Sequence, residues 1–496
     1  MAAIQAARRL SSRAHVLPGQ LHVTELFFEV PLNHAQPSAG TIRLFGRRVR
    51  KHERPIVPLS AADRASKEDK LPYLVYLEGG PGFGNKEPQN HSLTQVALRR
   101  GYQVLFLDYR GTGLSTPINA DSVLKRGGPQ EQAEYLKLFR ANSIVRDLEA
   151  VRLCLTAEFG EDSETEEEKE AKRAWSLFGQ SFGGFVSLTY LSKYPRGVRE
   201  VFLTGGLAPI RRTAEEVYTA TYKKLVERNQ AYYKKYPEDA ERVRRIAEYV
   251  QYPTDLGNSI SLPSGGRLTV PLLLSLGIAF GTHGGLDDVH SLVLRLNADL
   301  DQFNYFTRAS LAQFESRISF DTNPIYAILH EPIYCTRRSG GPASRWAAHR
   351  VGTTDASLRP YFGWLEDPKA FLRSRSTNPA EDPLHFAGEM VFPFHFDGSA
   401  GPDLARLRDA ANVLAETAEW DEDLYDEAQL ARNEVPVYAV SFIDDMFVDF
   451  GLARETAGLV RGIKVRETNR LYHDAVRSRS EDVFGMLFSM RDDCVD

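Results

Sequence analysis

A serine held between glycines, after an apolar segment and at the start of a helix-forming one, constrains this chain most. Residues 174–178 are apolar enough for a buried strand, and residues 179–183 read Gly-Gln-Ser-Phe-Gly. A strand–turn–helix of this kind lifts the hydroxyl of Ser181 off a sheet, in a turn too crowded for flanking side chains larger than glycine. The helix start leaves the N–H of Phe182 unpaired, so it can point at a developing oxyanion. The pattern therefore predicts a nucleophilic serine rather than an ordinary Gly-Ser turn.

Composition excludes several classes of protein. The 496 residues, 42% of them hydrophobic, can bury a full core and more than one layered unit. A net charge of −5 offers no basic surface for nucleic acid. The three cysteines, an odd number and widely spaced, predict a cytoplasmic, reducing compartment rather than a disulfide framework. The longest apolar stretch, 270–281, contains Pro271 and is too short for a bilayer, so we expect a buried helix and no membrane partner.

Three polar segments are expected outside the regular core. The first 24 residues carry three arginines and no acid, without the apolar segment of a secretory signal, which predicts a frayed basic terminus. Residues 51–70 are polar and charged, and they predict a loop. The acidic run 161–172 predicts a second, solvated loop.

Apolar runs that end in turn residues predict a mostly parallel sheet. Residues 24–30 and 40–45 alternate as in a hairpin, and buried strands follow at 73–77, 102–107, 174–178 and 201–204. Helical stretches, the clearest at 143–159, separate these strands. Strands that alternate with helices indicate a parallel sheet covered by helices on both faces.

The alternation of strands and helices stops after Pro209. From about 210 to 431 the chain is charged, aromatic and mostly helical, and strands return only at 435–440 and 464–468. We expect a helical cap over the carboxyl ends of the strands, where ligands bind in open α/β sheets. Together with the serine turn this predicts an α/β-hydrolase fold, with the core at 1–208 and 432–496 and the cap at 209–431.

A serine nucleophile needs a histidine base and an acid that orients it, and in this fold they follow in the order serine, acid, histidine. The strand at 435–440 leads to Asp444 and Asp445, either of which can be the acid. The strand at 464–468 leads to His473, the last histidine of the chain. We therefore predict Ser181, His473 and one of the two aspartates as catalytic residues, against the alternative that His473 is a surface histidine.

The glycine-rich loop at 78–82 is the expected source of a second oxyanion donor. Its glycines let the backbone approach a substrate, and Pro81 stiffens the turn. The N–H groups of Gly80 and Phe182 are the predicted pair.

Two patterns that suggest cofactors are incomplete. Residues 111–113 read Gly-Thr-Gly after a strand, but Thr116 stands where a dinucleotide fingerprint has its third glycine. His330 and Glu331 resemble the start of a zinc-protease helix, but Tyr334 replaces its second histidine. We therefore expect no nicotinamide cofactor and no metal.

The motifs at 79–82, 108–115 and 179–184 together resemble the proline iminopeptidase (prolyl aminopeptidase) family of α/β-hydrolase serine peptidases. The resemblance runs from about residue 15 to the end, and the cap segments 227–237, 330–334 and 388–393 are similar to the long type of fungi and actinobacteria. In this family the acid directly precedes a methionine or similar residue, which favours Asp445 before Met446, and the base matches His473. One residue departs from the family pattern: Glu78 stands where a histidine is usual.

The resemblance implies an enzyme without a cofactor that releases the N-terminal proline of small peptides through an acyl-enzyme. Such an enzyme must recognise a free ammonium group, and carboxylates are its natural partners because charge-assisted hydrogen bonds are the strong ones. In the family these acids come from the cap, where Glu331 is the best match and Glu389 and Glu227 are further candidates. Each of the three can instead be a solvated or structural acid.

Two other functions fit the same residues. A related capped esterase or amidase would use Ser181 on another acyl substrate, and a non-catalytic scaffold would only bind a ligand or partner. The intact serine, aspartate and histidine speak against the scaffold, which only Glu78 supports. A serine at position 181 excludes hydrolases with an aspartate nucleophile.

Overall fold

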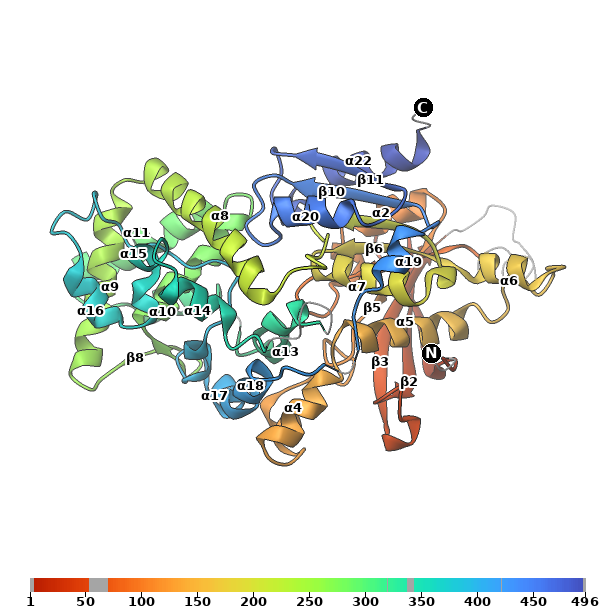
Figure 1. The fold of residues 1–496 in the computed structure, drawn as a ribbon, viewed down its shortest axis with the longest axis horizontal. Coiled ribbons are helices and arrows are strands. Elements are labelled where there is room, and N and C mark those ends of the chain that lie inside the picture. The colour runs from red at the N-terminus through yellow and green to blue at the C-terminus, as the bar shows by residue number, and fades with distance from the viewer. Residues whose placement is uncertain (1–3, 53–69, 319, 337–342, 421, 494–496) are drawn as a thin grey trace.

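A sheet of nine strands forms the centre of the molecule (Figure 1). The structure is a computed structural model that describes residues 4–52, 70–318, 320–336, 343–420 and 422–493, so the loop predicted at 51–70 lies almost wholly outside the described residues. The strand order is β1-β2-β3-β5-β4-β6-β7-β10-β11. The strands are β1 (Arg8–Leu17), β2 (Leu21–Pro31), β3 (Thr41–Lys51), β4 (Tyr73–Leu77), β5 (Gln103–Leu107), β6 (Trp175–Gln180), β7 (Val198–Thr204), β10 (Val437–Phe442) and β11 (Ile463–Thr468).

Strand pairing within the sheet changes from antiparallel to parallel at β5. The first three strands and β5 pair antiparallel, and β5, β4, β6, β7, β10 and β11 pair in parallel. The predicted opening hairpin is therefore correct, since β2 and β3 pair with Phe28 opposite Leu44. Parallel strands point their carboxyl ends toward one edge, and this edge is where the loops after β4, β6, β10 and β11 meet.

Helices cover both faces of the sheet, as predicted. Along β4 the buried side chains alternate between two hydrophobic clusters. Leu74 and Tyr76 belong to the cluster that contains α2 (Leu93–Arg99) and α22 (Ser480–Asp492), whereas Val75 and Leu77 belong to the one that contains α5 (Ala141–Leu155) and α7 (Phe182–Lys193). The other core helices are α3 (Ala120–Leu124), α4 (Pro129–Lys137), α20 (Phe450–Ala457) and α21 (Ala475–Ser478).

The predicted frayed terminus is wrong, because residues 8–17 form β1. This edge strand pairs antiparallel with β2, and Arg8 Nη2 lies 2.5 Å from Glu29 Oε1. Most of its side chains are exposed, so it has no apolar alternation by which the sequence would reveal it. Backbone hydrogen bonds alone define the strand.

The predicted loop at 161–172 is also wrong in its second half, which forms α6 (Glu166–Arg173). Thr165 caps this exposed helix, since its hydroxyl accepts a hydrogen bond from the N–H of Glu168. Acids occupy the first turn and Lys172 and Arg173 the last, an order that complements the helix dipole. Capping and charge order therefore stabilise a helix with no buried face.

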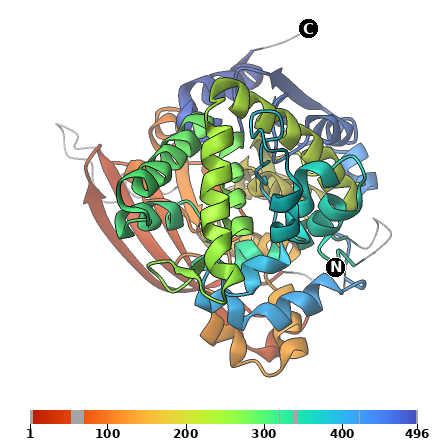
Figure 2. The same cartoon turned by 90° about the vertical axis from the view of Figure 1, so that its left-hand side faces the viewer.

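Between β7 and β10 the described regular elements are almost all helices. Its elements are α8 (Ala214–Lys235), α9 (Asp239–Asp255), a small hairpin of β8 (Ile260–Ser261) and β9 (Arg267–Leu268), α10 (Val270–Leu274), α11 (Gly285–Phe303), α12 (Arg308–Glu315), α13 (Pro324–Leu329), α14 (Ala347–Thr354), α15 (Arg359–Phe362), α16 (Pro368–Ser374), α17 (Pro402–Arg406), α18 (Arg408–Ala415) and α19 (Glu427–Ala431). In Figure 2 the green and teal helices of this segment lie in front of the sheet.

The helices of this segment form the body at the left of Figure 1. Of these helices, α17 and α18 also contact α3 and α4 of the core, and α19 packs against α7. The division of the chain at residues 209 and 431 stays a prediction. Among the residues that the structure describes, no helix is long and apolar enough to cross a membrane.

Candidate active site

Close packing determines the conformation of Ser181 between β6 and α7. Its backbone has φ 52° and ψ −121°, a conformation with positive φ that residues other than glycine rarely adopt. A Cβ atom on Gly183 would lie 2.0 Å from the carbonyl oxygen of Leu77, and one on Gly184 would lie 2.2 Å from that of Gly206. Glycine is therefore required at both positions, and the turn that presents Ser181 is strained because α7 approaches the strands so closely.

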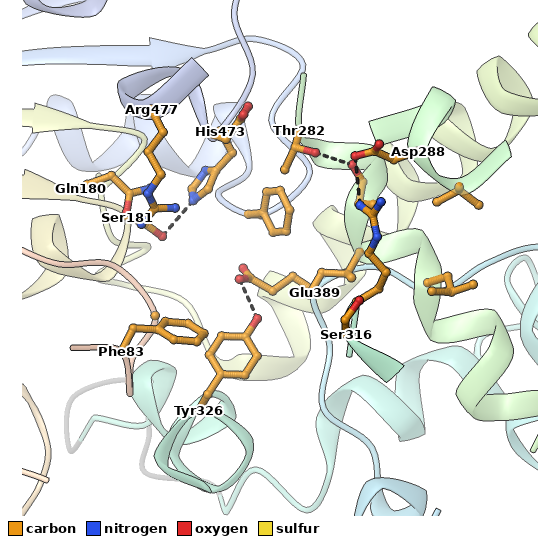
Figure 3. A pocket seen from close by; sticks show the side chains of 18 of the residues that line it. Phe83, Gln180, Ser181, Thr282, Asp288, Ser316, Tyr326, Glu389, His473 and Arg477 are labelled. Carbon is orange, nitrogen blue, oxygen red and sulfur yellow. Dashed lines mark hydrogen bonds and ion pairs between the residues drawn. The ribbon is translucent and has the colours of Figure 1, made fainter. Parts of the chain in front are cut away.

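Ser181, His473 and Asp445 form one hydrogen-bonded chain. His473 Nε2 lies 2.8 Å from Ser181 Oγ (Figure 3). On the other side of the ring, His473 Nδ1 lies 2.8 Å from Asp445 Oδ2. The other carboxylate oxygen of Asp445 accepts hydrogen bonds from the N–H groups of Phe447, at 2.8 Å, and Val448, at 3.1 Å. All three members of the chain are buried. The geometry is that of a nucleophile, a base and an acid that orients the base.

Asp444, the other predicted acid, points elsewhere. Its side chain is 40% exposed and lies 3.5 Å from Lys224 Nζ. Of the two aspartates that the sequence offered, Asp445 is the one in contact with His473.

The charges around His473 favour its protonated form. Burial of the ring opposes protonation, but the charge and hydrogen bond of Asp445, together with the charge of Glu389, raise the pKa of His473 above its ordinary value. Arg477 acts in the opposite direction. His473 is thus a stronger base than a histidine in water.

The predicted oxyanion donors belong to two segments next to the nucleophile. Gly80 lines the cavity in front of Ser181, and Phe182 begins α7, so its N–H has no partner within the helix. The loop that carries Gly80 is in close contact with the serine turn, since a Cβ on Gly79 would lie 2.3 Å from Gln180 Oε1.

Glu78, at the start of this loop, is buried and paired. Its Oε1 atom accepts hydrogen bonds from the N–H of Gly79, at 2.9 Å, and from Arg477 Nη2, at 2.5 Å. The negative charge that replaces the usual histidine is therefore balanced by an arginine four residues after His473.

A cavity of about 390 Å³ opens in front of Ser181, within the usual size range of small-molecule sites. Core loops contribute Gly80, Ser181, His473 and Arg477 to its lining. The helical segment between β7 and β10 contributes residues such as Leu276, Tyr326 and Glu389. Figure 3 shows Glu389 and Tyr326 across the cavity from Ser181.

Glu389 is held as an anion that faces this cavity. The hydroxyl of Tyr326 donates to its Oε1 atom at 2.9 Å, and His330 Nε2 lies 3.5 Å from its Oε2 atom. Burial disfavours the charge, but His330, His473 and the Tyr326 hydroxyl together lower the pKa of Glu389 below its ordinary value.

Comparison with known proteins agrees with this geometry. Residues 72–249 match the family model of the alpha/beta hydrolase fold. A proline iminopeptidase of Aspergillus aculeatus is 37% identical over 99% of this chain and 99% of its own length. One of Aeromonas sobria is 38% identical over 98% of this chain and 100% of its own length. The chain belongs to the proline iminopeptidase family. The resemblance inferred from the sequence motifs and the α/β-hydrolase fold are thereby confirmed.

The three glutamates that membership in the proline iminopeptidase family suggested occupy different places. Only Glu389 lines the cavity. Glu331, the first choice from sequence, is buried and its Oε2 atom accepts a hydrogen bond from the N–H of Ala348 at 3.2 Å, in the first turn of α14. Burial raises the pKa of Glu331, and its contact serves the helix start. Glu227 is 61% exposed and pairs with Lys224 at 2.6 Å.

Tyr326 and Arg477 line the cavity, but the sequence motifs did not single them out. Tyr326 stands four positions before His330, and Arg477 four positions after His473. For Tyr326, the helical spacing to His330 along α13 was the available signal.

The contacts of Ser181 give the first prediction. Ser181→Ala is expected to lower kcat by about 10⁴-fold or more, because no other group in the chain of hydrogen bonds can form the acyl bond. Thermal unfolding should be nearly unchanged, since the alanine keeps the backbone contacts of the turn. A variant that retained a substantial fraction of wild-type turnover would show that Ser181 is not the nucleophile.

A second prediction separates the two aspartates. Asp445→Asn should cost about 10⁴-fold in kcat, because an amide that donates to Nδ1 forces the tautomer of His473 whose Nε2 carries a proton and cannot accept one from Ser181. Asp444→Asn is the matched control and should have little effect, because its carboxylate is solvated. The reverse ranking of the two kcat values would assign the acid to Asp444.

The charges around His473 give a third prediction. His473 must be neutral to accept the proton of Ser181, so kcat/KM falls as the pH drops through its raised pKa. Glu389→Gln removes one of the charges that raise this pKa, and the acidic limb of kcat/KM for a neutral ester should therefore move to lower pH. Glu227→Gln is the control and should leave the limb in place. An unchanged acidic limb in Glu389→Gln would mean that the charge of Glu389 does not affect the pKa of His473.

Proposed function

We propose that this protein releases the N-terminal proline of small peptides through an acyl-enzyme. Ser181 Oγ attacks the carbonyl carbon of the proline residue while His473 accepts the hydroxyl proton and Asp445 holds the imidazole. The N–H groups of Gly80 and Phe182 stabilise the resulting oxyanion. Collapse of this intermediate breaks the peptide C–N bond, and His473 returns the proton to the leaving amine.

The second half of the reaction frees the enzyme. Water attacks the prolyl ester on Ser181, and His473 takes its proton and passes it to the departing serine oxygen. Free proline leaves, and Ser181 and His473 return to their starting protonation states. The proton transfers use Ser181, His473 and Asp445, which already form one hydrogen-bonded chain.

The position of Glu389 carries the proposal for an aminopeptidase. In an N-terminal proline the ammonium nitrogen is only two bonds from the carbonyl carbon that Ser181 attacks, so its partner has to share the cavity with Ser181. Glu389 does so, and its low pKa keeps it ionised at neutral pH. A charge-assisted hydrogen bond to the substrate ammonium would stabilise bound substrate and transition state.

Aromatic side chains around Glu389 suit the proline ring. Phe83 and Tyr326 line the cavity with their ring centroids 5.1 Å apart, and Phe447 lines it beside His473. A pyrrolidine is rigid and apolar apart from its nitrogen, so it gains from such walls without a large loss of conformational entropy. The ring would lie against the aromatic surfaces with its nitrogen toward Glu389.

The fourth prediction tests this assignment by selectivity. Compared with the wild type, Glu389→Gln should lose more than about tenfold in kcat/KM on a proline conjugate relative to a neutral ester, because a charged hydrogen bond contributes about 1.5–3 kcal/mol. Glu227→Gln, solvated and outside the cavity, is the matched control and should keep the wild-type ratio.

The same experiment includes a blocked substrate. The wild type should not cleave a proline conjugate whose nitrogen carries an acyl group, because acylation removes the charge and adds bulk next to Glu389. Cleavage of acylated and free proline conjugates at similar rates would reject the aminopeptidase and favour an esterase or amidase with another acyl specificity.

A further inference from the structure

Charges of opposite sign flank the Ser181–His473 pair. Glu389 comes from the helical segment, and Arg477 comes from α21, which directly follows the loop that carries His473. In Figure 3 the guanidinium of Arg477 lies beside Ser181, and Glu389 faces them from the other wall of the cavity. The proposed function uses Glu389 and leaves Arg477 without a role.

Arg477 is held in place from the core side and keeps further donors for the cavity. Its Nη2 atom donates to the buried carboxylate of Glu78 at 2.5 Å, which anchors the end of a long side chain. The buried Tyr76 hydroxyl also interacts with this guanidinium, which carries five N–H donors, so two core partners leave part of its hydrogen-bonding capacity unused. The side chain is 42% exposed and lines the cavity, so the remaining donors are open to a ligand.

The other charged groups near Arg477 are already engaged. Asp474 accepts hydrogen bonds from the N–H of His283, at 2.9 Å, and contacts the ring of the same histidine at 2.7 Å. Arg317, a second cation of the cavity lining, pairs with Asp288 at 3.1 Å within the helical segment. Arg477 thus combines a position beside the nucleophile with unused donors.

We propose that Arg477 binds the free carboxylate of the residue that leaves, so that the site selects dipeptides of the form Pro-X. The inference rests on the proposed function. In such a dipeptide the ammonium and the carboxylate stand on opposite sides of the peptide bond that is cleaved, each two bonds from an atom of that bond. In the site, Arg477 lies beside Ser181 and Glu389 faces both across the cavity, so the two charges are likewise separated. In a longer peptide an uncharged amide replaces the carboxylate, and an arginine fork binds it less strongly.

The test compares Pro-Gly with Pro-Gly-amide, two substrates that differ only in this charge. Their kcat/KM values are measured, because the leaving residue departs when the acyl-enzyme forms. The wild type should prefer the free acid by about tenfold or more. Arg477→Gln should lower this ratio by about the same factor, and Arg477→Lys, which keeps the charge and loses the planar fork, should give an intermediate ratio.

Two further variants guard against indirect effects. Arg477→Gln leaves Glu78 buried without its partner, so the double variant Glu78→Gln/Arg477→Gln removes both charges and should also lose the preference. Arg317→Gln removes a cation of the same cavity away from Ser181 and should keep the preference. A general change in the basicity of His473 alters both substrates alike and cancels in the ratio.

The possible outcomes separate the two proposals. Equal kcat/KM for the two substrates in the wild type, or a preference that survives in Arg477→Gln and in the double variant, would overturn the role of Arg477. If Arg317→Gln lost the preference and the Arg477 variants kept it, the carboxylate would instead be bound by Arg317 of the helical segment. Failure to cleave Pro-Gly, Pro-Gly-amide and a chromogenic proline conjugate would instead reject the proposed function.

Discussion

The site depends on the close approach between the start of α7 and the carboxyl ends of β4 and β7. At Gly183 and Gly184 the backbones are so near that a single added carbon would overlap a carbonyl oxygen. This contact holds Ser181 in its positive-φ conformation at the start of α7, where the N–H of Phe182 has no partner within the helix. Parallel pairing then brings the loops after β10 and β11 to the same edge, where Asp445 and His473 complete the hydrogen-bonded chain. Backbone packing thus sets the geometry before any charged group contributes.

The charged groups act on a site that is already shaped. Under the proposed function Glu389 has two roles. Its carboxylate would bind the substrate ammonium, and it also raises the pKa of His473. An ammonium bound at Glu389 would offset the field of that carboxylate at the imidazole and lower the pKa of His473. Binding of the correct substrate would then favour the neutral base that the reaction needs. Recognition and base strength are therefore linked through one side chain.

The sequence predicted those features that follow from steric and topological rules. The serine turn, the alternating strands and the chain order of Ser181, Asp445 and His473 belong to this group, because glycine spacing and strand order leave few arrangements. The proposed partner of the substrate ammonium was less predictable. Glu331 and Glu389 both occur in matching motifs, but only the packing of α14 shows that Glu331 serves a helix start. The exposed strand β1 and helix α6 escaped prediction because neither has an apolar face. The compartment and the domain boundaries stay predictions.

Glu78 looks unfavourable in the sequence, because it places a negative charge in a buried loop. In the structure it forms an ion pair with Arg477. A lone carboxylate in a buried loop would be costly, but Arg477 compensates it across nearly the whole length of the chain. Removal of one partner from a buried ion pair leaves an uncompensated charge and costs far more than exchange of both, so the two positions have to be considered together. A carboxylate at position 78 therefore connects the loop that contains Gly80 with the helix that follows His473, through an arginine that lines the cavity.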